Sequence, residues 1–438
     1  MLIPSNSDED RQQYHQHLVD SIVNRNFSSI IGYGILTFNS VEPSITERFP
    51  IPPISTTVFV APSSTALEMK HTQHSIAWPL FHSGVAAGLS IRDSKGVVDS
   101  SWITFNKPEK LNSEHAGFLL GLGLSGRLKN LTPWAAYPYL EARHEQTSLG
   151  ILLGMGASYA GSQDRLLTTV LSSHISALLP PGSIELNTSP IVQAGSWMSL
   201  GLVHVASGAF RFAEASLNEI QRRLIPGVEP STGFREIYSF SAACAFGLIM
   251  LGQGNKNAEF ELSATERLRK CLMESEDPQG EDKNDIEEDG IDLNVTAPGA
   301  TLALGLMYMR TNRKDISATI RPPDRPFLLD TIRPDLLLLR TIAICLIHFD
   351  EIESTYEWLN RQIPDYITDA WNKRVELNYI DDGIELAYLN IVAGASFALG
   401  LKYVGSMDQP AYQIVYHFFM YFINSSNTGS ELKVILRA

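Results

Sequence analysis

Cysteine is scarce in this chain, and the three cysteines that it has lie far apart. Cys244, Cys271 and Cys345 form no CxxC pair. Disulfide-stabilised secreted domains and structural zinc modules both depend on several cysteines at short spacings, so the sequence argues against both. The N-terminus, MLIPSNSDED, is polar and acidic, unlike a signal or transit peptide. We therefore expect a protein of the nucleus and cytoplasm.

Long hydrophobic runs and excess positive charge are also lacking. The longest apolar run, from Leu336 to Phe349, is interrupted by Arg340 and is shorter than the roughly 20 residues that span a bilayer. The formal net charge is −14. Because nucleic acids and anionic membrane surfaces attract basic proteins, we expect neither as a partner.

Negative charge is concentrated in one segment. Residues 274–292 contain ten acidic residues and one lysine, and so carry nine of the 14 net negative charges. Such a composition is typical of a disordered insertion, with an electrostatic tether for a basic partner as the functional alternative. Over the whole chain, 44% hydrophobic and 19% charged residues is the balance of a folded protein.

Glycine is not abundant, at 31 of 438 residues, but its positions repeat. The repeated motif is a small residue, three mostly apolar residues, a second small residue, a large apolar residue and usually a glycine, as in Gly117-FLL-Gly121-Leu122-Gly123. Good copies begin at residues 84, 117, 150, 195, 241, 299 and 394, and a degenerate copy begins at 341. Fifteen of the 31 glycines occupy the 24 small-residue positions of these eight copies. This concentration indicates a positional requirement.

The motif predicts closely packed helices. Residues four apart share one helix face, so paired small residues allow another backbone to approach, and this packing must offset the roughly 1 kcal/mol that glycine costs in a helix. Residues 164–179 and 210–224 have amphipathic spacing and would be partner helices, with Ser148, Thr188 and Ser189 as caps. A β-solenoid is the alternative, but sustained period-two alternation is lacking. We predict an all-α solenoid of helix-turn-helix repeats over residues 78–438.

Residues 1–77 precede the array. Asp8 to Asn24 could form one amphipathic helix. Five prolines between Pro43 and Pro62 favour extended, polyproline-like chain instead of helix. We expect this segment to run over the first repeats as a strap.

These residues resemble a known family. The motif is similar to the proteasome/cyclosome repeats shared by two proteasome regulatory-particle subunits and the largest subunit of the anaphase-promoting complex. The longer strings look most like the latter family, from about Pro50 to Tyr403, as in FNKPEKLNSEHAGFLLGLGLSGRLKNL, HEQTSLGILLGMGASYAGSQD and DLNVTAPGATLALGLMYMRTN. Members of that family are much longer, with a β-propeller before this region and further repeats after it. The resemblance therefore implies a fragment or truncated form, and an incomplete ring of repeats.

The resemblance implies a non-catalytic scaffold that organises the substrate-recognition and catalytic modules of a cullin-RING ubiquitin ligase controlling mitosis. The implied partners are the Doc-domain subunit, the cullin-RING module, the tetratricopeptide subunits and the β-propeller co-activators. A proteasome regulatory-particle scaffold is the alternative, and a helical α/α enzyme is a third hypothesis. An enzyme of that kind would need acids or a histidine pair lining one cavity.

No catalytic, cofactor-binding or metal-binding residue can be assigned from the sequence, and no small-molecule ligand is expected. Gly121-Leu-Gly-Leu-Ser-Gly126 matches GxGxxG, but it lies inside a repeat and does not follow a strand. His71 and His74 are interpreted as solvated linker residues. Four further histidines near repeat helices are interpreted as buried or capping residues: His115, His144, His174 and His204.

Overall fold

The computed structural model describes residues 40–53, 57–60, 65–68, 76–183, 188–221, 232–255, 258–272, 292–377 and 381–425. The helix expected from Asp8 to Asn24, His71 and His74, and residues 274–291 of the acidic segment lie outside these residues. The chain forms two compact units, Met1–Tyr159 with Ala438, and Ala160–Arg437. The predicted division after residue 77, the acidic insertion and the incomplete ring stay predictions.

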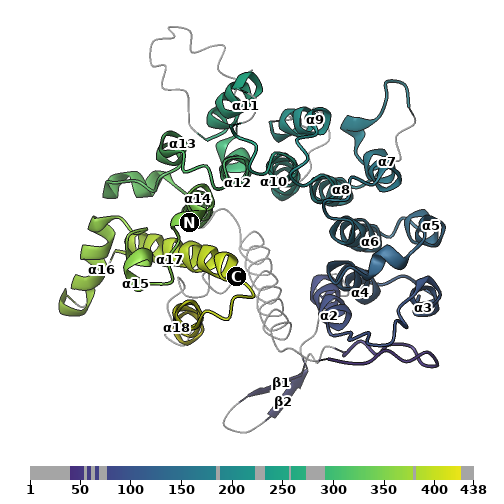
Figure 1. Cartoon of the computed structure of the whole chain (residues 1–438). Helices are drawn as coiled ribbons and strands as arrows, with labels where there is room; N and C mark the ends of the chain where they lie inside the picture. The colour runs from purple at the N-terminus through teal and green to yellow at the C-terminus, as the bar shows by residue number, and fades with distance from the viewer. Residues whose placement is uncertain are drawn as a thin grey trace, which may run out of the picture. The chain divides into compact units, whose positions relative to one another are not determined.

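The first unit is built on three stacked helices that carry the glycine motif. These motif helices are α2 (Ala77–Leu89), α4 (Ser113–Leu124) and α6 (Glu145–Ser158), and α4 packs against both others. The intervening segments form the cover helices α3 (Ser100–Phe105) and α5 (Pro133–Glu141), with a 3-10 turn η1 (Arg127–Asn130). Figure 1 shows α3 and α5 on one side of the three motif helices. The unit therefore has two helical layers.

The second unit repeats this plan with five motif helices. They are α8 (Pro190–Val203), α10 (Thr232–Ile249), α12 (Leu293–Met307), α14 (Pro334–Ile347) and α17 (Asp382–Lys402), and each packs on the next (Figure 1). The cover helices are α7 (Arg165–Ser173), α9 (Phe210–Ile220), α11 (Ala258–Lys270), α13 (Lys314–Thr319), α15 (Tyr356–Asn360), α16 (Asp365–Leu377) and α18 (Gln409–Ser425). Short 3-10 turns η2 (Ser176–Leu178), η3 (Pro326–Thr331) and η4 (Phe349–Glu351) complete the unit. All eight copies of the motif, the degenerate copy included, therefore lie on motif helices.

The helices begin where side chains can accept from the free N–H groups of the first turn. Asn112 caps α4 by accepting from the His115 amide at 2.9 Å, and Asp164 caps α7 by accepting from the Leu167 amide at 2.8 Å. The predicted cap at Ser148 is wrong, because α6 begins three residues earlier, at Glu145, and Ser148 is buried inside it. The cover helices expected at 164–179 and 210–224 are confirmed as α7 and α9, both shorter than predicted.

Residues 40–53 form extended chain that contacts the first unit. The Phe49 ring stacks on Phe118 of α4 with 5.6 Å between centroids, and the Phe49 amide donates to Asn106 at 2.7 Å. The indole N–H of Trp102, in α3, donates to the Ser44 carbonyl at 2.7 Å. Beyond this segment lies an antiparallel hairpin of β1 (Thr57–Val60) and β2 (Thr65–Glu68), which the sequence reading did not anticipate.

The predicted fold class is confirmed. Each unit is a solenoid of stacked helix pairs, and the β1–β2 hairpin is a small addition to it. Helix α17 is long and apolar enough to cross a membrane, but half of its apolar stretch is buried inside the protein. That burial is expected for a core helix, since α17 packs on α14, α16 and α18.

Candidate functional site

The first two small positions of the motif bring neighbouring backbones into contact. A Cβ atom on Gly121 of α4 would lie 2.5 Å from the Val85 carbonyl oxygen and 2.8 Å from the Gly88 Cα, both in α2. In the second unit, a Cβ atom on Gly394 of α17 would lie 2.7 Å from the Leu338 carbonyl oxygen in α14. Both glycines meet the preceding motif helix. The close packing predicted from the small residues is therefore confirmed.

The third small position faces the opposite way, toward the following motif helix. A Cβ atom on Gly201 would lie 2.7 Å from the Cα of Ala245, and one on Gly305 would lie 2.7 Å from the Cα of Ala343. Gly123 is packed in the same manner against Gly154 within the first unit. In α4 and α12 the motif thus provides one close-packing side for the preceding helix and another for the following one, whereas Gly84 and Gly88 of α2 pack on the following helix α4.

Four loops of the second unit, here called the bridging loops, donate backbone hydrogen bonds to the ends of α8, α10, α12 and α14. Gly161 and Gln163, two residues apart, both adopt positive φ, and their amides donate to Leu202 and Val203 at the end of α8. The same pair of hydrogen bonds recurs at distances of 2.9 to 3.1 Å from Ala206 and Gly208 to α10, from Gly252 and Gly254 to α12, and from Arg310 and Asn312 to α14. These bonds satisfy the last carbonyl groups of each helix, which have no partner within the helix itself. Sequence reasoning missed these loops, because residues as different as Gly161, Ala206 and Arg310 occupy their first donor position.

At the end of α17, the third small residue of the motif and the two loop amides contact no further motif helix among the described residues. A Cβ atom on Gly400, the third small residue of the last motif, would meet no atom within 4 Å. Gly405 and Met407 keep positive φ angles of 72° and 57°, but their amides have no acceptor in the described part of the chain. Phe397 and Val404 are exposed beside them, at 57% and 79%. We call this surface, formed by Phe397, Gly400, Val404, Gly405 and Met407, the open edge of α17.

The GxGxxG match is a packing element. Gly121 and Gly123 lie within α4 and contact α2 and α6, while Gly126 follows the helix in a left-handed turn with φ of 77°. A dinucleotide site would need this sequence to follow a strand and open a helix. Here it closes a helix, so the structure gives it no phosphate-binding geometry.

The four repeat histidines occupy the buried and capping positions predicted for them. His144 is the N-cap of α6, and the ring of His174 lies 2.8 Å from the Val170 carbonyl at the end of α7. His204 is buried against Phe212 and lies 3.0 Å from the Thr168 hydroxyl. Burial lowers the pKa of His204 below its usual value.

His115 is the most enclosed of these histidines, at 4% exposure. Its ring stacks on Tyr139 with 5.7 Å between centroids. Burial, reinforced by the positive charge of Lys107, lowers the pKa of His115 to about 4. The ring is therefore neutral at physiological pH, as expected for a core residue.

The cysteines are buried thiols. Cys244, Cys271 and Cys345 are free and at most 4% exposed, and burial raises the pKa of Cys244 and of Cys345 to about 12. Within the described residues, no group of three or more His, Cys, Asp and Glu side chains could hold a metal ion.

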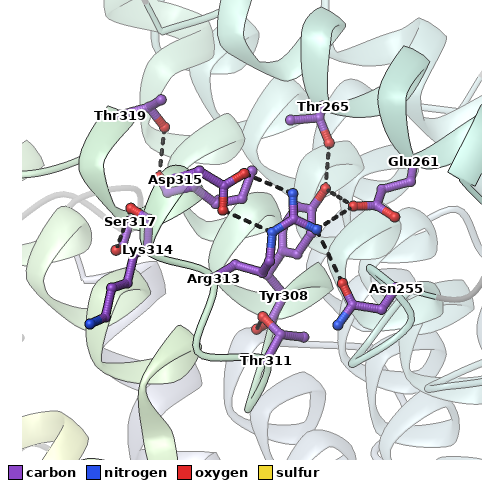
Figure 2. Close-up of polar contacts among 11 residues, drawn as sticks. Asn255, Glu261, Thr265, Tyr308, Thr311, Arg313, Lys314, Asp315, Ser317 and Thr319 are labelled. Carbon is purple, nitrogen blue, oxygen red and sulfur yellow. Dashed lines mark hydrogen bonds and ion pairs between the residues drawn. The ribbon is translucent and has the colours of Figure 1, made fainter.

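A polar network joins three helices of the second unit at Arg313 (Figure 2). The guanidinium donates to both carboxylate oxygens of Asp315, to Glu261 of α11 at 3.0 Å and to Asn255 at 3.2 Å. Tyr308, at the end of α12, donates to Glu261 at 2.9 Å and lies under the guanidinium. Hydrogen bonding to Arg313 lowers the pKa of Asp315 to about 2, and burial raises the pKa of Tyr308 to about 12. The network fixes the α12–α13 turn against α11.

The same arrangement recurs one repeat later. Arg333 donates to Asp335 at the start of α14, to the Asn294 carbonyl at 3.0 Å and to Glu236 at 3.5 Å. An arginine two residues before an aspartate, at a helix start, is the sequence signal for both networks, and the sequence reading overlooked it. In both networks the charged side chains pair with one another, and these pairs connect neighbouring repeats.

Taken together, the packing glycines, the bridging loops and the arginine networks define a helical repeat protein in which these groups join one repeat to the next. Comparison with known proteins identifies the family. Residues 165–436 match the family model described as "APC1 fifth domain", and residues 2–160 match "APC1 fourth domain". The chain belongs to the APC1 family, as the resemblance of its motifs implied. Its two compact units coincide closely with these two domains.

Named relatives agree with this assignment. The chain is 37% identical to anaphase-promoting complex subunit 1 of Schizosaccharomyces pombe, over 93% of this chain and 27% of that protein. It is 35% identical to anaphase-promoting complex subunit 1 of Homo sapiens, over 97% of this chain and 23% of the relative. A protein named "Negative regulator of mitosis" in Emericella nidulans is 34% identical, over 97% of this chain and 20% of the relative. The chain thus spans about a quarter of the length of these relatives.

Proposed function

We propose that this chain is a scaffold region of the anaphase-promoting complex and acts without catalytic chemistry of its own. The observation that carries the proposal is the series of close backbone contacts from α8 to α17, to which loop hydrogen bonds are added at α8, α10, α12 and α14. Such a stack positions surfaces over a long distance, because each repeat holds the next at a fixed spacing. The names of the relatives supply the complex in which the stack would act.

The partners follow from the same proposal. They are the Doc-domain subunit, the cullin-RING module, the tetratricopeptide subunits and the β-propeller co-activators, with no nucleic acid, membrane or small-molecule ligand among them. The open edge of α17 presents the same glycine and loop amides that join neighbouring repeats, and we infer that a further helix covers it.

We base the proposed lack of catalytic function on the contacts that the polar side chains make. The buried histidines are packed or cap helices, and the described carboxylates with strong interactions pair with arginines that connect repeats. We infer that these groups stabilise the stack. Substituting Asp315 or Glu261 should therefore reduce thermal stability, and should reduce ubiquitin transfer by the assembled complex only as far as assembly itself is reduced.

The test is a tagged pull-down from dividing cells with mass spectrometry of the recovered proteins. Recovery of the cullin, RING and Doc-domain subunits is the expected result. Gly121→Leu, which places a bulky side chain between α2 and α4, should lose them, while Lys373→Glu on the exposed face of α16 should retain them. Recovery of proteasome ATPase subunits, or of no subunit by a chain with intact helical circular dichroism, would contradict the proposal.

Localisation to the nucleus and cytoplasm is part of the same proposal. Imaging a fluorescent fusion in dividing cells tests it, and the expected result is signal in both compartments. Accumulation in membranes or secretion into the medium would contradict it.

A further inference from the structure

The second unit contains a cavity of about 750 Å³ between α13, the end of α14 and α15. Its lining includes Ser317 and Ala318 of α13, and Arg361 and Gln362 just after α15. All of its lining residues belong to the same compact unit. A volume of this size accommodates a few side chains of a peptide.

The floor of the cavity is apolar. It is formed by Ile344 and Cys345 of α14, by Ile352 and by Trp358 of α15. Ile352 is only 3% exposed and Trp358 only 5%. Because Ile344 is only half-buried, it offers most of the apolar area against which a ligand side chain can pack without a hydrogen bond.

The walls carry uncompensated positive charge. Lys314 and Arg321 are exposed and have no ion-pair partner among the described residues, whereas only one of the two cavity glutamates pairs with an arginine. Glu353 pairs with Arg361 at 3.1 Å, and Glu351 lies 3.7 Å from His348. Three cationic side chains (Lys314, Arg321 and Arg361) against two carboxylates (Glu351 and Glu353) leave the lining positive on balance.

A second observation concerns Arg340, which lies one helical turn before Ile344 in α14 and is not itself a lining residue of the cavity. Arg340 precedes Ile344 by four residues, so both side chains extend from the same side of α14. The Arg340 Nε atom is buried and has no hydrogen-bond partner, and no ion pair to this side chain occurs within the described residues. Burial lowers the pKa of the Arg340 guanidinium, so an anion brought close to it would be stabilising.

We propose that this cavity binds an acidic peptide segment of a partner protein. Its carboxylates pair with Lys314 and Arg321, and a neighbouring apolar side chain rests on the floor formed by Ile344, Ile352 and Trp358. This inference is independent of membership in a ubiquitin ligase, because the binding is measured on the isolated full chain.

The probe is a fluorescein-labelled EDLFED peptide, titrated with the full chain and followed by fluorescence anisotropy. We expect saturable binding that weakens with added salt, because exposed charges carry part of it. The double variant Lys314→Glu/Arg321→Glu should weaken binding at least tenfold. Ala318→Trp, which fills the cavity without changing its charge, should do the same. Lys373→Glu removes an exposed charge on α16 and should change the affinity less than twofold.

Several outcomes would overturn the proposal. An absence of saturable binding would do so, as would equal affinity in the parent chain and in either cavity variant. Equal binding of an oligothymidylate with the same charge would show a general attraction for polyanions instead of peptide recognition. If replacing residues 275–291 by a short Gly-Ser linker tightened probe binding tenfold or more, the chain's own acidic segment would be the occupant. Circular dichroism of each variant reports whether its helices are retained.

Discussion

Gly305 and Gly400 occupy the same position of the motif, yet alanine should have opposite effects at the two sites. Both glycines are the third small residue, and each lies two residues before the end of its helix. A Cβ atom on Gly305 would lie 2.7 Å from the Cα of Ala343 and 2.8 Å from its Cβ. These atoms belong to the backbone and to a rigid methyl group, so α12 and α14 would have to move apart. At Gly400 no atom lies within 4 Å of the added methyl group.

The magnitude follows from two opposing contributions to the free energy of unfolding. Alanine favours the helix over glycine by roughly 1 kcal/mol at either site. Overpacking of a close contact costs about 1–3 kcal/mol, and only Gly305 has such a contact. The helix contribution cancels in the comparison, so Gly400→Ala should be more stable than Gly305→Ala by about 1–3 kcal/mol. Gly400→Ala should also be more stable than the parent chain.

The assay is thermal unfolding of the parent and both variants, followed by helical circular dichroism and calorimetry. Because both glycines belong to the second compact unit, the same transition reports both changes. Each 1 kcal/mol corresponds to a shift of roughly 2–4 °C in the midpoint for a large domain. Equal midpoints for the two variants, or a lower midpoint for Gly400→Ala, would refute the assignment of the third position to packing on the following helix.

Three further changes test other parts of the core. Gly121→Leu and Gly154→Leu should each destabilise the first unit by ~1–3 kcal/mol or more, because the side chain enters a backbone contact, and unchanged melting of both would contradict the repeat packing. The folded pKa of His115 is about 4 and its usual pKa is 6.5, so the unfolded chain binds more protons between these values. Stability should therefore fall by up to about 3 kcal/mol as pH falls from 6.5 to 4, and urea titrations of His115→Phe should show a smaller loss over that window. Cys244 and Cys345 should resist a thiol reagent at pH 8 in the folded chain and react in urea, and rapid native labelling would contradict their burial.

The positions of the motif helices could be predicted because glycine is rare and its spacing is repeated. The degenerate copy beginning at Thr341 is instructive, since it lies on α14 with Cys345 and Ile347 buried in the motif positions. This copy could be placed in the series because it divides the otherwise long gap between the copies that begin at residues 299 and 394. The gap before Gly394 also holds two cover helices, α15 and α16, whose presence has no counterpart in the motif.

The direction of each contact could not be predicted from spacing alone. A small residue permits close approach on its own face, but the sequence does not say whether the preceding or the following helix occupies that face. The bridging loops were missed for a related reason, because Ala206, Arg310 and Asn312 take positive φ where glycine would be the expected residue. Their strain is offset by hydrogen bonds to a helix about 40 residues away, which no local pattern displays.

Hydrogen exchange distinguishes these bridging loops from the loop at the open edge. The amides of Gly208 and Asn312 donate to the last carbonyls of the next motif helix at 3.0 and 3.1 Å, so they should exchange slowly. The amides of Gly405 and Met407 have the same backbone conformation without an acceptor in the described part of the chain, and should exchange rapidly in the isolated chain. If another helix covers the open edge within the assembled complex, these two amides should become protected there while the interior loops stay unchanged. Slow exchange of Gly405 and Met407 in the isolated chain would mean that the edge is already covered, and rapid exchange in both states would mean that the complex does not join the stack at α17.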